Sequence, residues 1–118
     1  MSPRLLGAAL LATIACAVPR SVPRDTAADA DRAAALAEDR RADDLERALS
    51  ALSLEEKPLD CAHVCELVEQ ICDLSRRICL ISERHEGDAG LAARCAAAEQ
   101  RCRRSRDRVP PGCSCQPR

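Results

Sequence analysis

Cysteines recur at intervals of seven residues on both sides of one turn, and this spacing constrains the fold more than any other feature. Seven residues make close to two helical turns, so cysteines at this interval lie along one face of a helix. The two series are Cys65, Cys72 and Cys79, then Cys95 and Cys102. Between them the polar, glycine-rich run over residues 86–90 predicts a turn. The chain is therefore expected to fold back on itself as two helices.

Facing residues of an antiparallel helical hairpin have position numbers that add to a constant. Cys79 with Cys95 and Cys72 with Cys102 both add to 174, which centres the hairpin on Gly87. The spacing thus predicts two disulfides between the helices, Cys79–Cys95 and Cys72–Cys102.

The other cysteines lie at the open end of this hairpin. Cys61 and Cys65 are one helical turn apart, about 6 Å, and Cys113 and Cys115 are separated by about 6.5 Å if the tail is extended. Each tail cysteine can therefore pair with one cysteine of the first turn. A tail that continues toward the start of the first helix favours Cys65–Cys113 and Cys61–Cys115, and the crossed order remains open.

The first helix of the hairpin, expected over about residues 59–85, also carries an aliphatic seam beside its cysteines. The seam residues follow at alternating spacings of three and four. They are Val64, Leu67, Ile71, Leu74, Ile78 and Ile81. The second helix, expected over about residues 88–106, offers mainly alanine and cysteine, so it can approach closely enough for disulfides but cannot cover the whole seam.

Two candidates can cover the seam: a helix within residues 25–54 or a second copy of the chain. The N-terminal candidate carries an apolar stripe at helical spacing, made of Ala42, Leu45, Leu49 and Leu52. The alternative for this segment is a charged spacer that does not pack on the hairpin.

Charged residues fit the same antiparallel register. Asp73 is expected to face Arg101, and Glu66 is expected to face Arg108. The alternative is that the arginines after residue 100 form a basic patch for anionic partners.

Residues 1–17 resemble a signal peptide, with a short basic start and an apolar run from Leu5 to Ala15. Thr13 to Cys16 resembles a bacterial lipobox, which predicts lipidation at Cys16, although Leu is usual where Thr13 stands. Ordinary cleavage after Ala17 is the alternative. Residues 18–57 then form a tether and a charged, Ala-rich helix or spacer, and residues 58–118 form the Cys-rich hairpin. Eight cysteines remain for the folded part, an even number suited to an oxidising compartment.

Composition argues against several classes of function. The chain has no aromatic residue and a net charge of −1, so neither stacking nor overall charge favours nucleic acid as a partner. No nucleophile with a nearby base, no Gly-rich phosphate loop and no C-x-x-C motif is present, so no enzyme activity and no cofactor are expected. Metal binding is the rival, because soft thiolates suit Cu(I) and zinc. Its ligands would be Cys61, Cys65, Cys72, Cys79, Cys95 and Cys102.

Residues 61–115 resemble a group of small Cys-rich bacterial envelope proteins, often lipoproteins. The matching features are an Ile-Cys motif in the first helix, an Arg-Cys motif in the second and a terminal Cys-x-Cys. They stand here as Ile71-Cys72, Ile78-Cys79, Arg94-Cys95, Arg101-Cys102 and Cys113-Ser114-Cys115. The group has no assigned activity, so the resemblance implies a fold and a compartment only. The sequence predicts an all-α, disulfide-stapled hairpin, exported and held at the envelope by a lipid anchor or secreted. Its expected role is structural or adaptor-like, with a protein partner or self-association through the Val64–Ile81 seam.

Overall fold

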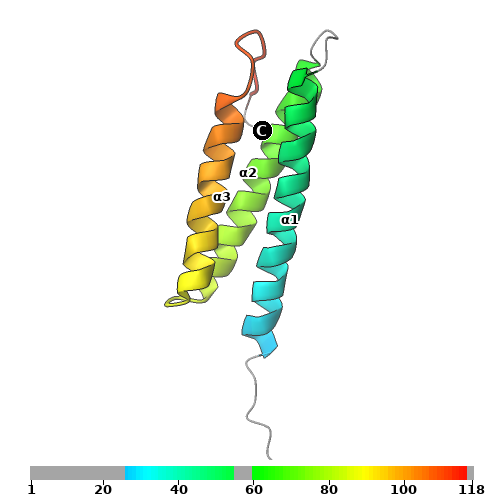
Figure 1. Cartoon of the computed structure of the whole chain (residues 1–118). Coiled ribbons are helices and arrows are strands. Elements are labelled where there is room, and N and C mark those ends of the chain that lie inside the picture. The colour runs from blue at the N-terminus through cyan, green and yellow to red at the C-terminus, as the bar shows by residue number, and fades with distance from the viewer. Residues whose placement is uncertain (1–25, 55–59, 117–118) are drawn as a thin grey trace, which may run out of the picture.

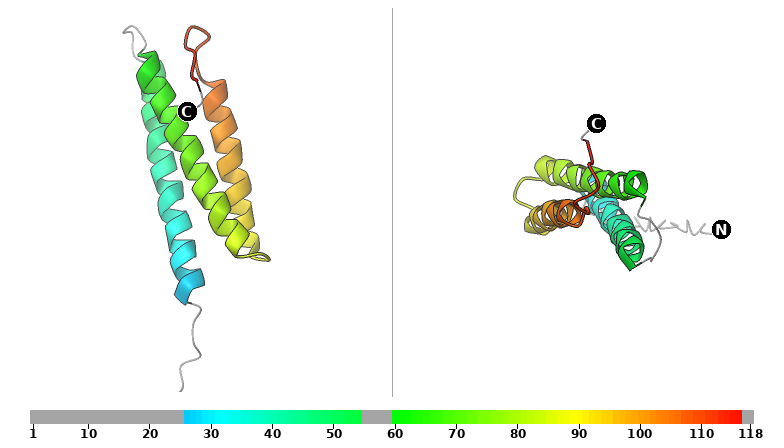
Figure 2. Two further views of the ribbon diagram at one scale, coloured as in Figure 1. Left: turned by 180° about the vertical axis from the view of Figure 1, so that it is seen from behind. Right: turned by 90° about the horizontal axis from the view of Figure 1, so that it is seen from above.

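The computed structural model describes residues 26–54 and 60–116, and these ranges contain three α-helices and no strand (Figure 1). Helix α1 spans Thr26–Leu54, α2 spans Cys61–Arg84 and α3 spans Ala89–Asp107. Helices α2 and α3 form the predicted antiparallel hairpin, and α1 packs beside it as the third helix of a bundle (Figure 2). The all-α, disulfide-stapled hairpin is therefore confirmed.

Both hairpin helices begin at an aspartate that caps them. The backbone N–H of His63 donates to Asp60 Oδ1 (3.2 Å), and that of Leu91 donates to Asp88 Oδ1 (3.0 Å). Such caps satisfy backbone donors that the first helical turn leaves free. The turn between α2 and α3 contains Gly87 with φ of 88°, in the left-handed region that a side chain disfavours. The hairpin thus reverses at the position on which the cysteine register is centred.

Replacing Gly87 with alanine is expected to lower the free energy of unfolding by about 1 kcal/mol. A Cβ at this position would meet no atom within 4 Å, so the whole effect comes from the backbone conformation. Urea denaturation measures it. Gly112→Ala is the matched control, because that Cβ also meets nothing within 4 Å and the backbone there does not have a positive φ. Equal stability of the two variants would contradict the prediction.

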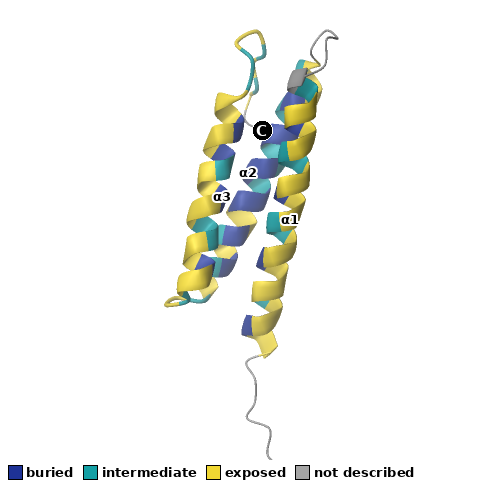
Figure 3. Cartoon of the chain, viewed as in Figure 1, coloured by how far each residue is buried: buried dark blue, intermediate teal, exposed yellow. Residues whose placement is uncertain are grey.

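Helix α1 covers the aliphatic seam of α2. All six seam residues are buried, and Leu49 of α1 joins Val64, Leu67 and Ile71 in the main core cluster. Buried residues accordingly lie along the sides of the helices that face each other (Figure 3). The prediction that an N-terminal helix docks on the seam is confirmed. The seam is buried in this arrangement, and self-association through it stays a prediction.

The buried face of α1 changes in character along its length. Its buried residues recur every seven positions, as expected for a helix that follows a partner helix. They are Ala28, Ala35, Ala42 and Leu49. Leu45 and Leu52 add partly buried packing near the C-terminal end. Helix α1 therefore packs through leucines near its C-terminal end and mainly through alanines over the rest.

Candidate functional site: a disulfide-lined groove

Four disulfides join α2 to α3 and to the tail. The inner two are Cys72–Cys102 and Cys79–Cys95, with Cα atoms 4.7 and 4.6 Å apart. These are the pairs that the register predicts, and the small residues of α3 allow the short helix separation that they require.

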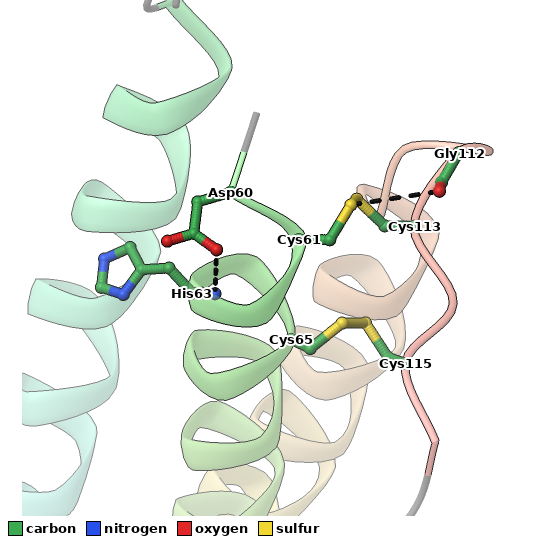
Figure 4. The surroundings of a disulfide bond; sticks show 7 residues. All are labelled: Asp60, Cys61, His63, Cys65, Gly112, Cys113 and Cys115. Atoms are coloured by element: carbon green, nitrogen blue, oxygen red, sulfur yellow. Dashed lines mark hydrogen bonds between the residues drawn. A yellow bond between two sulfur atoms is a disulfide. The ribbon is translucent and has the colours of Figure 1, made fainter. Parts of the chain in front are cut away.

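The outer disulfides are Cys61–Cys113 and Cys65–Cys115 (Figure 4). The predicted order, Cys65–Cys113 and Cys61–Cys115, is therefore wrong. After α3 the chain makes a reverse turn, in which the backbone N–H of Cys113 donates to the carbonyl of Pro110 (2.9 Å). The tail then runs alongside α2 in the same direction, so its first cysteine meets the first residue of the helix and its second meets the next turn.

An open groove of about 830 Å³ lies where the tail meets the hairpin, and we call it the hairpin groove. Its lining comes from α2, α3 and the tail. Val68, Val109 and the Cys65–Cys115 disulfide provide apolar lining, and Glu69, Arg76 and Arg106 provide charges. A groove with apolar lining and a few charged groups can bind another molecule by packing and ion pairing.

The groove offers no free thiol, because all eight cysteines of the described chain are paired. Among the described residues, one group of metal-ligand type lies outside the groove lining. The sulfurs of Cys79 and Cys95 and a carboxylate oxygen of Glu99 all lie within 4.8 Å of one another. The two sulfurs are bonded to each other, so thiolate ligation at this place requires reduction.

Arg94 and Arg101 of α3 form ion pairs with carboxylates of α1. The guanidinium of Arg101, with 16% of its side chain exposed, lies 2.6 Å from Asp43, 3.4 Å from Asp39 and 3.3 Å from Glu46. Asp73 instead pairs with Arg76 of its own helix (2.7 Å), and Arg108 donates to Ser50. The predicted pairs Asp73–Arg101 and Glu66–Arg108 are therefore wrong. The sequence does carry a signal for the pairs that form. Asp39, Asp43 and Glu46 lie four and three residues apart, which places them on one face of α1.

A second charged cluster ties the N-terminal part of α1 to the α2–α3 turn. Asp31 accepts hydrogen bonds from His85 (2.7 Å) and Arg84 (3.2 Å), and Arg32 donates to Asp88 (2.9 Å). The hydrogen bond from His85, and next that from Arg84, lowers the pKa of Asp31 below its ordinary value. The pKa of Asp88 is also lowered, first by the Leu91 backbone N–H and then by Arg32. Ionised carboxylates are thus favoured at this end of the bundle.

Acid is expected to weaken the attachment of α1 through Asp31. Because its pKa is depressed in the folded state, the ionised carboxylate stabilises the fold above its ordinary pKa, and this contribution is lost as the pH falls through the lowered value. Between about pH 4 and pH 2, the melting temperature of Asp31→Asn should fall less than that of the parent chain. Asp44→Asn is the control. Among the ion pairs described, Asp44 pairs only with Arg47, an exposed residue of the same helix. An unchanged pH profile in Asp31→Asn would contradict this account.

Comparison with protein-family models, with curated proteins and with solved structures finds no match to this chain. In the ranges that the structure describes, no helix has the length and hydropathy needed to cross a membrane. The four disulfides are typical of proteins in an oxidising, extracytoplasmic environment. Cys16 and the rest of residues 1–17 lie outside the described residues.

Proposed function

We propose that this chain is an exported, non-enzymatic protein of the cell envelope, anchored by lipid at Cys16, with a structural or adaptor role. The observation that carries the proposal is the complete pairing of its eight remaining cysteines. Paired cysteines provide a rigid scaffold and leave no thiol for catalysis or metal binding. The proposed relationship to small Cys-rich envelope proteins rests on the same cysteine pattern.

A bundle of this kind suits contact with other molecules better than chemistry. Neither histidine has a nucleophile among its described hydrogen-bond partners: His85 is hydrogen-bonded to Asp31, and the side chain of His63 is exposed. The hairpin groove instead joins apolar lining to charged groups, as protein contact surfaces do. An adaptor role is therefore favoured over an enzymatic one.

Intact mass spectrometry of protein isolated from its own compartment, alkylated without reduction, tests the disulfide part of the proposal. We expect all eight cysteines between residues 61 and 115 to resist alkylation. Eight alkylated cysteines would overturn it. The same spectrum tests the anchor, because lipidated Cys16 adds the mass of its acyl groups and becomes the first residue.

Membrane fractionation of a Cys16→Ser variant tests the anchor independently. We expect the parent chain to sediment with membranes and the variant to lose that association. Retention of the mature variant in the membrane fraction, with its signal peptide removed, would contradict lipid anchoring while leaving the disulfide scaffold untouched.

Thiolate metal binding is the alternative function, and one observation favours it. The ligand-type atoms of Cys79, Cys95 and Glu99 lie close enough together to hold one ion once the disulfide is reduced. Native mass spectrometry separates the two functions, because bound copper or zinc together with alkylatable cysteines supports only the metal site.

A further inference from the structure

The two inner disulfides differ in how well the bundle covers them. Cys72 and Cys102 are 6% and 9% exposed, so burial protects the bond between them from reagents. Cys79 and Cys95, toward the α2–α3 turn, are only partly buried. The rate at which a thiol attacks a disulfide depends on access to its sulfurs. A dissolved thiol therefore reaches the Cys79–Cys95 bond more easily than the other inner bond.

The carboxylate of Glu99 lies against this partly exposed bond. One of its oxygens is 3.8 Å from the Cys79 sulfur, and a carboxylate oxygen lies within 4.8 Å of the sulfurs of both Cys79 and Cys95. Glu99 follows Cys95 by four residues on α3, which places both on one helix face. Long helical side chains lean toward the preceding turn. The helix thus sets the carboxylate over the disulfide.

The charge of this carboxylate is not neutralised by an arginine. Glu99 is exposed and takes part in none of the ion pairs between described residues. Arg76, three residues before Cys79 on α2, pairs with Asp73 (2.7 Å). An exposed carboxylate is negatively charged at neutral pH. A full negative charge therefore stands beside the two sulfurs.

Reduction of a disulfide by thiols places negative charge on the same sulfurs. An attacking thiolate bonds to one sulfur while the S–S bond breaks, and the other sulfur leaves as a thiolate. A second thiolate then displaces the first, so two reagent thiols become a disulfide and the two cysteines become thiols. Because the carboxylate lies close to both sulfurs, it repels this charge whichever of them is attacked.

We propose that Glu99 protects the Cys79–Cys95 disulfide from reduction by small thiols. The inference rests on the proposed disulfide scaffold and adds a means of preserving it. Burial protects the Cys72–Cys102 bond, and charge protects the partly exposed bond nearer the turn.

Glu99→Gln tests the protection, because it removes the charge and keeps the size of the side chain. The full-length, disulfide-bonded protein is treated with mercaptoacetate under native conditions, free thiols are alkylated at intervals, and peptide mass spectrometry follows each cysteine pair. Reduction of Cys79–Cys95 should be roughly threefold to tenfold faster in the variant. Asp107→Asn is the control, because this exposed acid of α3 lies about 18 Å along the helix from Cys95, beyond the screening length of about 10 Å in dilute salt.

The charge of the reagent separates protection by charge from a general loosening of the bundle. Mercaptoacetate carries a carboxylate and cysteamine carries an ammonium group, so Glu99→Gln should accelerate reduction by mercaptoacetate more than reduction by cysteamine. A loosened bundle would react faster with both reagents alike and would also expose the Cys72–Cys102 pair. Added salt should narrow the difference between the parent chain and the variant, because it screens the carboxylate.

Two results would overturn the protection alone. They are equal reduction rates in the parent chain and Glu99→Gln with mercaptoacetate, and equal acceleration with the two reagents. Cysteines that are alkylated before any reagent is added would overturn the disulfide scaffold as well, so the failure of the protection and the failure of the scaffold are distinguishable.

Discussion

Replacing Cys79 and Cys95 together by alanine is expected to lower the free energy of unfolding by about 3 kcal/mol, the chain-entropy value for a loop of this size. The disulfide closes a separation of 16 residues across the turn, and without it the unfolded hairpin gains conformational freedom. Urea denaturation of the oxidised double variant measures the loss, and thermal melting should show a much lower midpoint.

The outer disulfides provide the control for this prediction. Cys61–Cys113 and Cys65–Cys115 close separations of 52 and 50 residues, so either bond closes nearly the same loop. Removing Cys61 and Cys113 alone should therefore cost less than the 52-residue separation suggests, because Cys65–Cys115 still holds the tail. Removing both outer disulfides should release the tail and cost more than either alone. Unchanged stability in the Cys79/Cys95 variant would contradict the ladder.

Leu49→Ala is expected to lower the free energy of unfolding by about 3 kcal/mol, as is usual for a buried leucine. Leu49 is 2% exposed and is the residue of α1 in the main core cluster. The substitution removes its methyl groups from the contacts with α2 and leaves a cavity. Urea denaturation measures the loss, and hydrogen exchange of α1 amides should become faster.

Leu36→Ala is the matched control for the Leu49 prediction. It makes the same change in the same helix at a side chain that is 41% exposed, so stability should change by about 0.5 kcal/mol or less. Equal losses at the two positions would mean that α1 does not pack on α2 through Leu49.

Features that depend on helical period were predictable from the sequence, and features that depend on direction around a helix were not. The constant sum of 174 identifies residues at the same height on the two helices, and it predicted both inner disulfides correctly. The same arithmetic failed for Arg101, which directly precedes Cys102 in the chain. Neighbouring residues differ by about 100° around a helix, so a cysteine directed at α2 places Arg101 toward α1, where its carboxylate partners lie.

The hairpin groove could not be predicted from the sequence, for a different reason. The hairpin groove exists because the tail reverses between Pro110 and Cys113 and then follows α2. Periodicity does not describe a non-repeating turn, so neither the order of the outer disulfides nor the groove could be derived. The docking of α1 was predictable, because the aliphatic seam of α2 would otherwise be exposed to water.

The uneven packing of α1 has a mechanical consequence. Its N-terminal end extends past the α2–α3 turn (Figure 1) and is held by alanines and by the ion pairs of Asp31 and Arg32. A pulling force applied at residue 26 loads these weak contacts one after another, so α1 should peel from that end. Peeling then meets the buried contacts of Ala35 and the carboxylates around Arg101, and it is resisted most by Leu49 in the main core cluster. Helix α1 can thus detach progressively under load while the cross-linked hairpin keeps its shape.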